Sequence, residues 1–467
     1  MAPKQDFLVK VIKTEVVAAV LPMQEHWLPL SNLDLLLPPV EVGVFFCYQK
    51  PSSASTTFGS MTSVLKKALA QTLVSYYSFA GEMVQNVGGE PELLCNNRGV
   101  DFVEAFADIE LLELNLYNPD DSIEGKLVPQ KEKGVMSVQV TQLKCGGLVV
   151  GCTFDHRVAD AYSANMFLVS WAEMARSKPL TTLPSYRRSS LFSRRPGHYD
   201  DSINNMYSIF SKLPLPEKES NGNINTNQAP ISRIYYVKAE HVHQLQLLAN
   251  EDNNCVEGSK RTKLEAFTAF LWKLIAKGTN AGDKYCRLGI VVDGRTRLFD
   301  GDENEAKLMM NNYFGNVLSI PFGQKKNKEL EKMPLSIIAN EVHNFLHEAV
   351  TKEHFLGLID FVEAHRPEPA LAKIYASKVT KEEPAFVVSS GQRFPIRKID
   401  FGWGVPVFGS YHFPWGAQSG YVMPMPSASG NGDWVVYMHL PEEQIKVIEY
   451  NAAHVFKPFS HYCLSFV

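Results

Sequence analysis

Two continuous apolar runs constrain the fold of this chain most. Residues 41–50, EVGVFFCYQK, and residues 147–154, GLVVGCTF, are rich in β-branched and aromatic side chains, which is typical of buried strands. After the second run, apolar residues recur at helical spacing within residues 161–176: Ala164, Phe167, Leu168, Trp171 and Ala175. A buried strand that leads into an amphipathic helix predicts a mixed α/β fold.

A polar stretch divides the chain near its middle. Between residues 177 and 230 the periodicity gives way to Pro, Ser, Arg and Asn, a composition typical of connections between domains. Beyond it we expect a strand at 231–237, helices at 264–276 and 335–348, and a strand at 433–441 followed by a short acidic helix. The 467 residues suit two domains of about 200 residues each. We predict an N-terminal domain at 1–185, a crossover at 186–230 and a C-terminal domain at 231–467, with these crossover arginines solvated: Arg187, Arg188, Arg194 and Arg195.

Charge and composition exclude several classes of protein. Apolar residues make up 45% and charged residues 21% of the chain, the balance of an ordered globular protein. A net charge of −4 gives no general attraction to nucleic acid or to an anionic membrane. The first 20 residues interleave charged and apolar side chains, unlike a signal peptide, and no stretch is apolar enough to span a bilayer. The seven cysteines are scattered without a CxxC pair, so we expect a reduced, cytoplasmic protein whose partners are small molecules.

His156 is the first candidate for chemistry. It lies in FDHRVADAYS, between a predicted strand and a predicted helix, where packed elements hold the backbone while the side chain faces a cleft. Asp160 follows at His-x-x-x-Asp spacing, which occurs once among the thirteen histidines. The spacing alone leaves open a packed or surface histidine.

The second candidate is the segment Asp400-Phe401-Gly402-Trp403-Gly404. Two glycines around aromatic residues indicate a tightly held loop that aims Trp403. A purely structural aromatic turn is the alternative.

Taken together, these two segments resemble the signatures of the plant BAHD acyltransferase family, HxxxD and DFGWG. Three further segments are similar to family motifs and occur in the family order: LSNLD at 30–34, VDGRTR at 292–297 and YFGN at 313–316. The resemblance covers nearly the whole chain. It implies two chloramphenicol-acetyltransferase-like domains of mixed sheet and helices, with a channel between them that coenzyme A enters from one side and the acceptor from the other. It also implies acyl-CoA as co-substrate, with no bound cofactor and no metal.

The resemblance also implies roles for single residues. His156 would act as general base on the O–H or N–H of the acceptor, without a covalent acyl-enzyme. Asp160 would pair with Arg295 as a structural ion pair, with orientation of His156 as the alternative. Trp403 would donate its indole N–H to the oxyanion or only shape the channel, Asp400 would fix its own loop as a hydrogen-bond acceptor, and Ser31 would line the acceptor side.

Residues 259–265 are the candidate coenzyme A segment. Thr262 and Glu265 have the spacing of a capping box ahead of a helix, and the positive end of a helix suits a phosphate. Family precedent favours nucleotide contacts from Ser259, Lys260, Arg261, Thr262 and Lys263. A capped helix with solvated lysines is the alternative.

Other site types find little support. His343 and His347 are spaced i, i+4, but no third ligand accompanies them, so we expect a solvent-facing pair and no metal. GxSxG, GxGxxG and Walker motifs do not occur, which argues against a serine hydrolase, a dinucleotide enzyme and a P-loop NTPase.

Two departures from the family pattern bear on the substrate. Ala161 replaces a usual glycine, and Ser389-Ser390-Gly391 replaces a tryptophan-containing segment. The missing tryptophan should widen or reshape one channel wall. The segment HRVADAYS and the LDLLLPP start resemble those of coniferyl-alcohol-type acyltransferases. The leading hypothesis is O-acylation of a phenylpropanoid-type alcohol by a short acyl-CoA, catalysed by a monomer. Hydroxycinnamoyl transfer to an alcohol or amine is the second hypothesis, and a catalytically silent protein-binding relative is a third, of another class.

Overall fold

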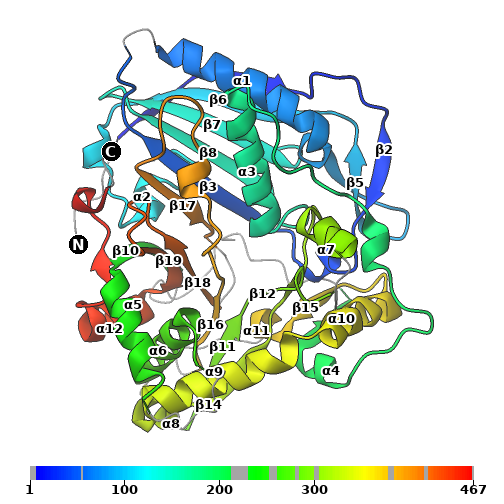
Figure 1. Cartoon of the computed structure of the whole chain (residues 1–467), viewed down its shortest axis with the longest axis vertical. Helices are drawn as coiled ribbons and strands as arrows, with labels where there is room; N and C mark the ends of the chain where they lie inside the picture. Colours follow the sequence, from blue (N-terminus) through cyan, green and yellow to red (C-terminus); the bar gives the residue numbers. More distant parts are fainter. Residues whose placement is uncertain are drawn as a thin grey trace, which may run out of the picture.

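Two mixed sheets with their helices make up the molecule (Figure 1). The structure is a computed structural model that describes residues 7–53, 56–211, 230–251, 260–278, 283–298, 304–376, 383–414 and 419–464. Within the polar stretch at 177–230, residues 212–229 lie outside the described residues.

The first sheet has six strands, in the order β1 (Val9–Val17), β6 (Val100–Ala107), β7 (Met136–Leu143), β8 (Leu148–Asp155), β3 (Glu41–Tyr48) and β17 (Phe408–His412). Neighbouring strands are antiparallel except for the parallel pair β6–β7. Helices α1 (Phe58–Ser75) and α3 (Ala161–Ala175) pack against each other on one face of this sheet (Figure 1). Because β17 comes from the second half of the chain, the first sheet contains strands from both halves.

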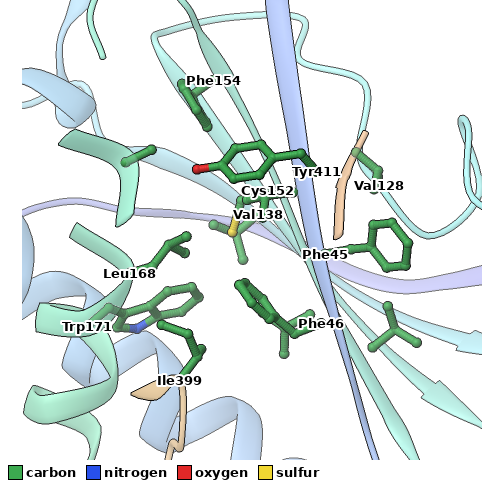
Figure 2. Close-up of a cluster of buried hydrophobic side chains, with 14 of the residues drawn as sticks. Phe45, Phe46, Val128, Val138, Cys152, Phe154, Leu168, Trp171, Ile399 and Tyr411 are labelled. Atoms are coloured by element: carbon green, nitrogen blue, oxygen red, sulfur yellow. The ribbon is translucent and has the colours of Figure 1, made fainter. Parts of the chain in front are cut away.

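Alternating side chains of β3 fill the core on both faces of this sheet. Phe45 and Phe46 are both fully buried and, as neighbours in a strand, point to opposite faces. Figure 2 shows Phe46 on the side of Leu168 and Trp171 from α3, and Phe45 on the side of Val128. Burying one such ring contributes roughly 1.5–3 kcal/mol, so this packing fixes β3 and β8, which lead to the candidate base.

The second sheet has seven strands, in the order β14 (Phe322–Lys326), β11 (Tyr285–Ile290), β16 (Ala385–Val388), β18 (Gly420–Pro426), β19 (Trp434–Pro441), β10 (Pro230–Val237) and β20 (Lys457–Pro458). Helix α6 (Lys263–Lys277) packs against α5 (Ala239–Leu248), α8 (Asn327–Lys332), α9 (Leu335–Ala349) and α12 (Glu442–Ala452). Trp272 of α6 is buried in the core between these helices and the sheet.

Smaller elements connect the two sheets. The pairs β12 (Val292–Asp293) with β13 (Leu318–Ser319), and β9 (Tyr207–Ile209) with β15 (Ala370–Ala372), lie near α10 (Lys352–His365), α4 (Ser202–Met206), α7 (Asn304–Asn311) and α11 (Lys373–Ala376) (Figure 1). Strands β2 (His26–Pro29), β5 (Pro91–Cys95) and β4 (Glu82–Gln85) form a three-stranded sheet, and α2 (Pro119–Ser122) contacts β10.

The strands and helices named from the sequence are confirmed, with boundaries that differ by one or two residues: β3, β8, β10, β19, α3, α6, α9 and α12. Among the described residues, no helix is long and apolar enough to cross a membrane.

The expectation of a solvated arginine cluster in the crossover is wrong for two of its members. The Arg188 side chain is buried, and its guanidinium lies 3.6 Å from the buried carboxylate of Asp34. Arg194 makes a 2.7 Å ion pair with Asp360, which is also buried. Sequence composition predicted solvation because it could not show these carboxylates, which come from distant parts of the chain.

Candidate active site

His156 is the first residue after β8. Its backbone N–H donates to the carbonyl oxygen of Val40, at 2.9 Å, which ties the turn to the segment before β3. The imidazole lies edge-on to the ring of Phe413, with centroids 6.1 Å apart. Imidazole Nδ1 is buried and has no hydrogen-bond partner among the described residues. The backbone is thus held on an ordered strand end while the ring keeps an unused hydrogen-bonding atom.

Burial lowers the pKa of His156 below its ordinary value of 6.5. Its own backbone carbonyl, the carboxylates of Asp160 and Asp155 and the side chain of Asn316 act in the opposite direction but do not cancel the desolvation. A lowered pKa leaves the imidazole neutral near pH 7, which is the form that can accept a proton.

Asp160 caps α3 and pairs with Arg295, as expected. One carboxylate oxygen accepts from the backbone N–H of Ser163 at 2.9 Å, and the Arg295 guanidinium donates to both oxygens at 2.7 and 3.1 Å. Arg295 also lies over the ring of Tyr162, 4.5 Å from its centroid. Asp160 and Arg295 are both buried. The Asp160 carboxylate is therefore occupied by α3 and the β12 segment, and it makes no hydrogen bond to His156 among the described residues.

Asp34 and Asn316 are the residues at this site to which sequence reasoning gave no role. The Asn316 backbone N–H and side-chain Nδ2 both donate to Asp34 Oδ1, at 2.7 and 2.9 Å. The same Nδ2 lies 3.0 Å from the carbonyl oxygen of His156 and 3.1 Å from that of Arg157. The available signal was the pair of matching segments LSNLD and YFGN, which carry these residues. Nothing local in either segment indicates that they meet.

Ser31 is not arranged to meet an acceptor. Its side chain is buried, its hydroxyl donates to Asp34 Oδ2 at 2.7 Å, and its oxygen accepts from the Asp34 backbone N–H at 3.2 Å. The hydroxyl is engaged in holding Asp34, so the structure does not support the expected acceptor-lining role.

Trp403 lies far from His156. Its ring packs against that of Tyr48, with centroids 6.2 Å apart, and Tyr48 pairs with Leu148 at the start of β8. The seven residue steps from Leu148 to Asp155, which precedes His156, span about 23 Å of strand. An oxyanion donor must lie about 3 Å from the reacting oxygen. Although the indole N–H has no partner among the described residues, the geometry speaks against the expected donor role.

Asp400 holds the loop that carries Trp403. Its Oδ1 accepts from the backbone N–H groups of Gly402 and Gly404, at 2.8 and 3.0 Å, and its Oδ2 lies 3.3 Å from the guanidinium of Arg176 at the end of α3. Both glycines have positive φ, +112° and +113°, which other residues adopt only with strain. These contacts agree with the loop-fixing role expected for Asp400.

The expected coenzyme A segment begins with a capped helix. The Thr262 hydroxyl accepts from the Glu265 backbone N–H, and the Glu265 carboxylate accepts from the Thr262 backbone N–H. The predicted capping box is therefore present. Lys260 and Lys263 are exposed, whereas Arg261 is buried and donates to Asn340 at 2.9 Å. Ser259 lies outside the described residues.

The expectation of a solvent-facing histidine pair on α9 is wrong for His343. Its Nδ1 lies 2.7 Å from the Glu265 carboxylate, whereas His347 is exposed. Among the described residues, no three His, Cys, Asp or Glu side chains group closely enough to hold a metal ion.

The expected widening or reshaping of a channel wall at Ser389-Ser390-Gly391 stays a prediction, and the space beside Gly391 is filled. A Cβ added there would lie 2.6 Å from the Met425 side chain and 2.7 Å from the Pro424 carbonyl oxygen. Strand β18 thus occupies the space beside this glycine.

Several known proteins resemble this chain in sequence or in fold. The family model described as "Transferase family" matches residues 7–455. Omega-hydroxypalmitate O-feruloyl transferase of Arabidopsis thaliana is 30% identical over 81% of this chain and 78% of its own. Shikimate O-hydroxycinnamoyltransferase of Nicotiana tabacum is 28% identical over 92% of this chain and 96% of its own.

Among solved structures, vinorine synthase superposes with a TM-score of 0.68 at 17% identity, covering 97% of this chain and all of its own. F. graminearum TRI101 complexed with coenzyme A and deoxynivalenol superposes with a TM-score of 0.70 at 15% identity, covering 92% of this chain and 98% of its own.

The chain has a two-domain fold of the chloramphenicol-acetyltransferase type. Together with the family match and these relatives, the fold identifies it as an acyl-CoA-dependent acyltransferase. The chain belongs to the Transferase family, that is, to the BAHD acyltransferases. Acyl-CoA is its co-substrate.

Proposed function

We propose that this enzyme transfers an aromatic acyl group of the hydroxycinnamoyl type from coenzyme A to the hydroxyl of a small acceptor, with His156 as general base. The observation that carries the proposal is the aromatic surrounding of His156. Phe413 lies edge-on to the imidazole, and Tyr421 of β18 lies edge-on to Phe413, with centroids 5.0 Å apart. Such rings favour flat, apolar aromatic groups.

The names of the relatives support this acyl class. One is a feruloyl transferase and another a hydroxycinnamoyltransferase acting on shikimate. The relative named agmatine hydroxycinnamoyltransferase 1, from Oryza sativa subsp. japonica, takes an amine instead and is 27% identical over 92% of this chain and 94% of its own. A short acyl group transferred to a phenylpropanoid-type alcohol remains the second candidate, because the same rings would suit an aromatic alcohol.

The proposed mechanism needs one proton carrier. Neutral His156 takes the proton of the acceptor hydroxyl as its oxygen attacks the thioester carbonyl carbon. The tetrahedral intermediate then collapses, the C–S bond breaks, and the imidazolium returns the proton to the coenzyme A thiolate. Because the acceptor attacks the thioester directly, no covalent acyl-enzyme forms.

Coenzyme A binding is proposed at the N-terminal end of α6, where the exposed Lys260 and Lys263 flank a helix terminus that favours phosphate. We further propose that donor and acceptor reach His156 through a channel between the two domains, and that the enzyme works as a monomer in the cytoplasm.

The test is product formation, measured by mass spectrometry, from acetyl-, malonyl-, benzoyl- and coumaroyl-CoA against coniferyl alcohol, shikimate, quinate and an aliphatic amine. Ester from coumaroyl-CoA, absent with His156→Ala, is the expected result. Ester formed from acetyl-CoA and coniferyl alcohol alone would replace the proposed acyl class with the second candidate.

Two other outcomes would go further. Amide as the main product would change the acceptor class. No product from any pair, together with a stoichiometric protein partner that copurifies, would favour a silent binding protein over an enzyme of the proposed specificity.

A further inference from the structure

Among the described residues, the carboxylates near His156 are all paired, so none of them is free to orient it. Three carboxylates lie near the histidine, and each has an arginine partner: Asp155 with Arg157 at 2.6 Å, Asp160 with Arg295 at 2.7 Å and Asp34 with Arg188 at 3.6 Å. A general base needs its ring and its tautomer fixed by a hydrogen bond at the nitrogen that does not take the proton. None of these carboxylates makes that hydrogen bond among the described residues.

Asn316 is a neutral side chain that is hydrogen-bonded to the backbone of the histidine. Its carboxamide is anchored by Asp34, which accepts from both the backbone N–H and Nδ2 of Asn316. Since Nδ2 also lies 3.0 Å from the His156 carbonyl oxygen, the Asn316 side chain lies directly against the residue that carries the imidazole. Asn316 is itself fully buried, so water does not compete for its polar atoms.

Two buried atoms of these residues have no hydrogen-bond partner among the described residues, and they are complementary. Imidazole Nδ1 is a donor in the tautomer that leaves Nε2 free, and Asn316 Oδ1 is an acceptor. Leaving either atom unsatisfied costs about 1–3 kcal/mol. The Asn316 side chain also acts to raise the pKa of His156.

We propose that Asn316 is a positioning residue for His156. Nδ2 holds the His156 carbonyl, and Oδ1 accepts the Nδ1 proton in the reactive orientation of the ring. Nε2 is then unprotonated and faces the acceptor hydroxyl. As Nε2 gains the proton, the hydrogen bond from Nδ1 to Oδ1 strengthens, which stabilises the imidazolium. Asp34 holds the carboxamide in place by accepting from Nδ2. This inference rests on the proposed role of His156 as base.

Asn316→Ala tests the proposal through the rate and the pH profile. We expect kcat to fall about 10- to 100-fold, the scale of losing a histidine's orienting partner, with little change in KM. The Asn316 side chain raises the pKa of His156, so its removal lowers that pKa further. The ascending limb of kcat/KM, which reports deprotonation of the base, should move to lower pH.

Gln139→Ala is the matched control. Gln139 is a buried carboxamide of β7 that donates to the carbonyl oxygen of Lys126 at 2.6 Å, away from His156. Its loss should lower stability without moving the pH limb. An Asn316→Ala enzyme whose limb stays in place, or whose kcat matches that of the control, would overturn the proposal.

Asn316→Leu keeps roughly the volume of the side chain but removes both of its polar atoms. Its limb should move to lower pH, like that of Asn316→Ala, and if the alanine variant does not fold, this shift decides alone. An unchanged limb would overturn the inference. His156→Ala in the same assay separates the two levels: near-normal turnover would remove the proposed base, whereas an inactive His156→Ala beside unaffected Asn316 variants would remove only the role of Asn316.

Discussion

The two ends of the β3–β8 strand pair carry the two segments that pointed to function, and they differ in construction. At the end that holds His156, buried ion pairs and carboxamide contacts join segments from five parts of the chain. At the end that holds Trp403, a half-exposed aspartate and two glycines shape a loop against Tyr48 and Arg176. Two motifs that occur together in a sequence can thus lie at separate ends of one sheet, with the proposed base at one end and a loop held by hydrogen bonds at the other.

His156→Ala is expected to have the largest effect on rate. Loss of a general base lowers kcat by roughly 10²–10⁴, and the fold should persist because the His156 backbone, not its ring, makes the hydrogen bonds to Val40 and Asn316. Single-turnover kinetics and thermal unfolding of the same preparation check both statements. Turnover near that of the unchanged enzyme would break the assignment of chemistry to this end.

Asp160→Ala should have the largest effect on stability. It leaves the buried guanidinium of Arg295 without its main partner, which lowers the free energy of unfolding by about 3–5 kcal/mol. Activity should fall because less of the protein is folded. Urea denaturation measures the change in the free energy of unfolding. The matched variant at the other end, Asp400→Ala, should cost only about 1–2 kcal/mol, because that carboxylate is 24% exposed. Equal losses at the two ends would contradict the comparison.

The burial of His354 predicts that the protein loses stability as the pH falls. This buried histidine of α10 lies 2.7 Å from the hydroxyl of Ser319, on the strand that pairs with β12. Burial lowers its pKa from 6.5 to about 4. Below pH 6.5 the unfolded chain therefore binds a proton that the folded chain does not. The protonation of His354 therefore leaves the free energy of unfolding unchanged above about pH 6.5. It lowers that free energy by about 3 kcal/mol as the pH falls toward 4.

Unfolding measured between pH 7 and 4 tests this expectation. His354→Gln should lose less stability over that interval than the unchanged enzyme does. Parallel curves for the two proteins would show that His354 is not responsible.

Local pattern predicted much of the fold but not the contacts that join distant segments. Strands β3 and β8 and helix α3 follow from continuous apolar runs and helical spacing, which neighbouring residues determine. The pairing of β17 with β3 could not be predicted, because a strand of five residues carries no signal for its partner. Asp34 and Asn316 are 282 residues apart, and only the folded chain shows that they meet beside His156.

The same limit explains where the site was predicted correctly and where it was not. The contact of Asp160 with Arg295 could be predicted because the family pattern pairs the two motifs that carry these residues. Ser31 and Trp403 were expected to face the reaction from motif membership alone, without information on where their side chains lie. In the structure, Ser31 holds Asp34, and Trp403 packs on Tyr48.

Trp403→Phe should have the smallest effect and gives the sharpest test of the comparison. The phenyl ring can keep the contact with Tyr48, and the change removes an indole N–H that has no partner among the described residues. The free energy of unfolding should change by less than about 1.5 kcal/mol. If Trp403 only supports its loop, kcat should stay within about twofold, whereas removing a true oxyanion donor lowers kcat by about 10²–10³. A loss of that size in an enzyme of unchanged stability would bring Trp403 back to the reaction and would mean that the two ends of the sheet work on one intermediate.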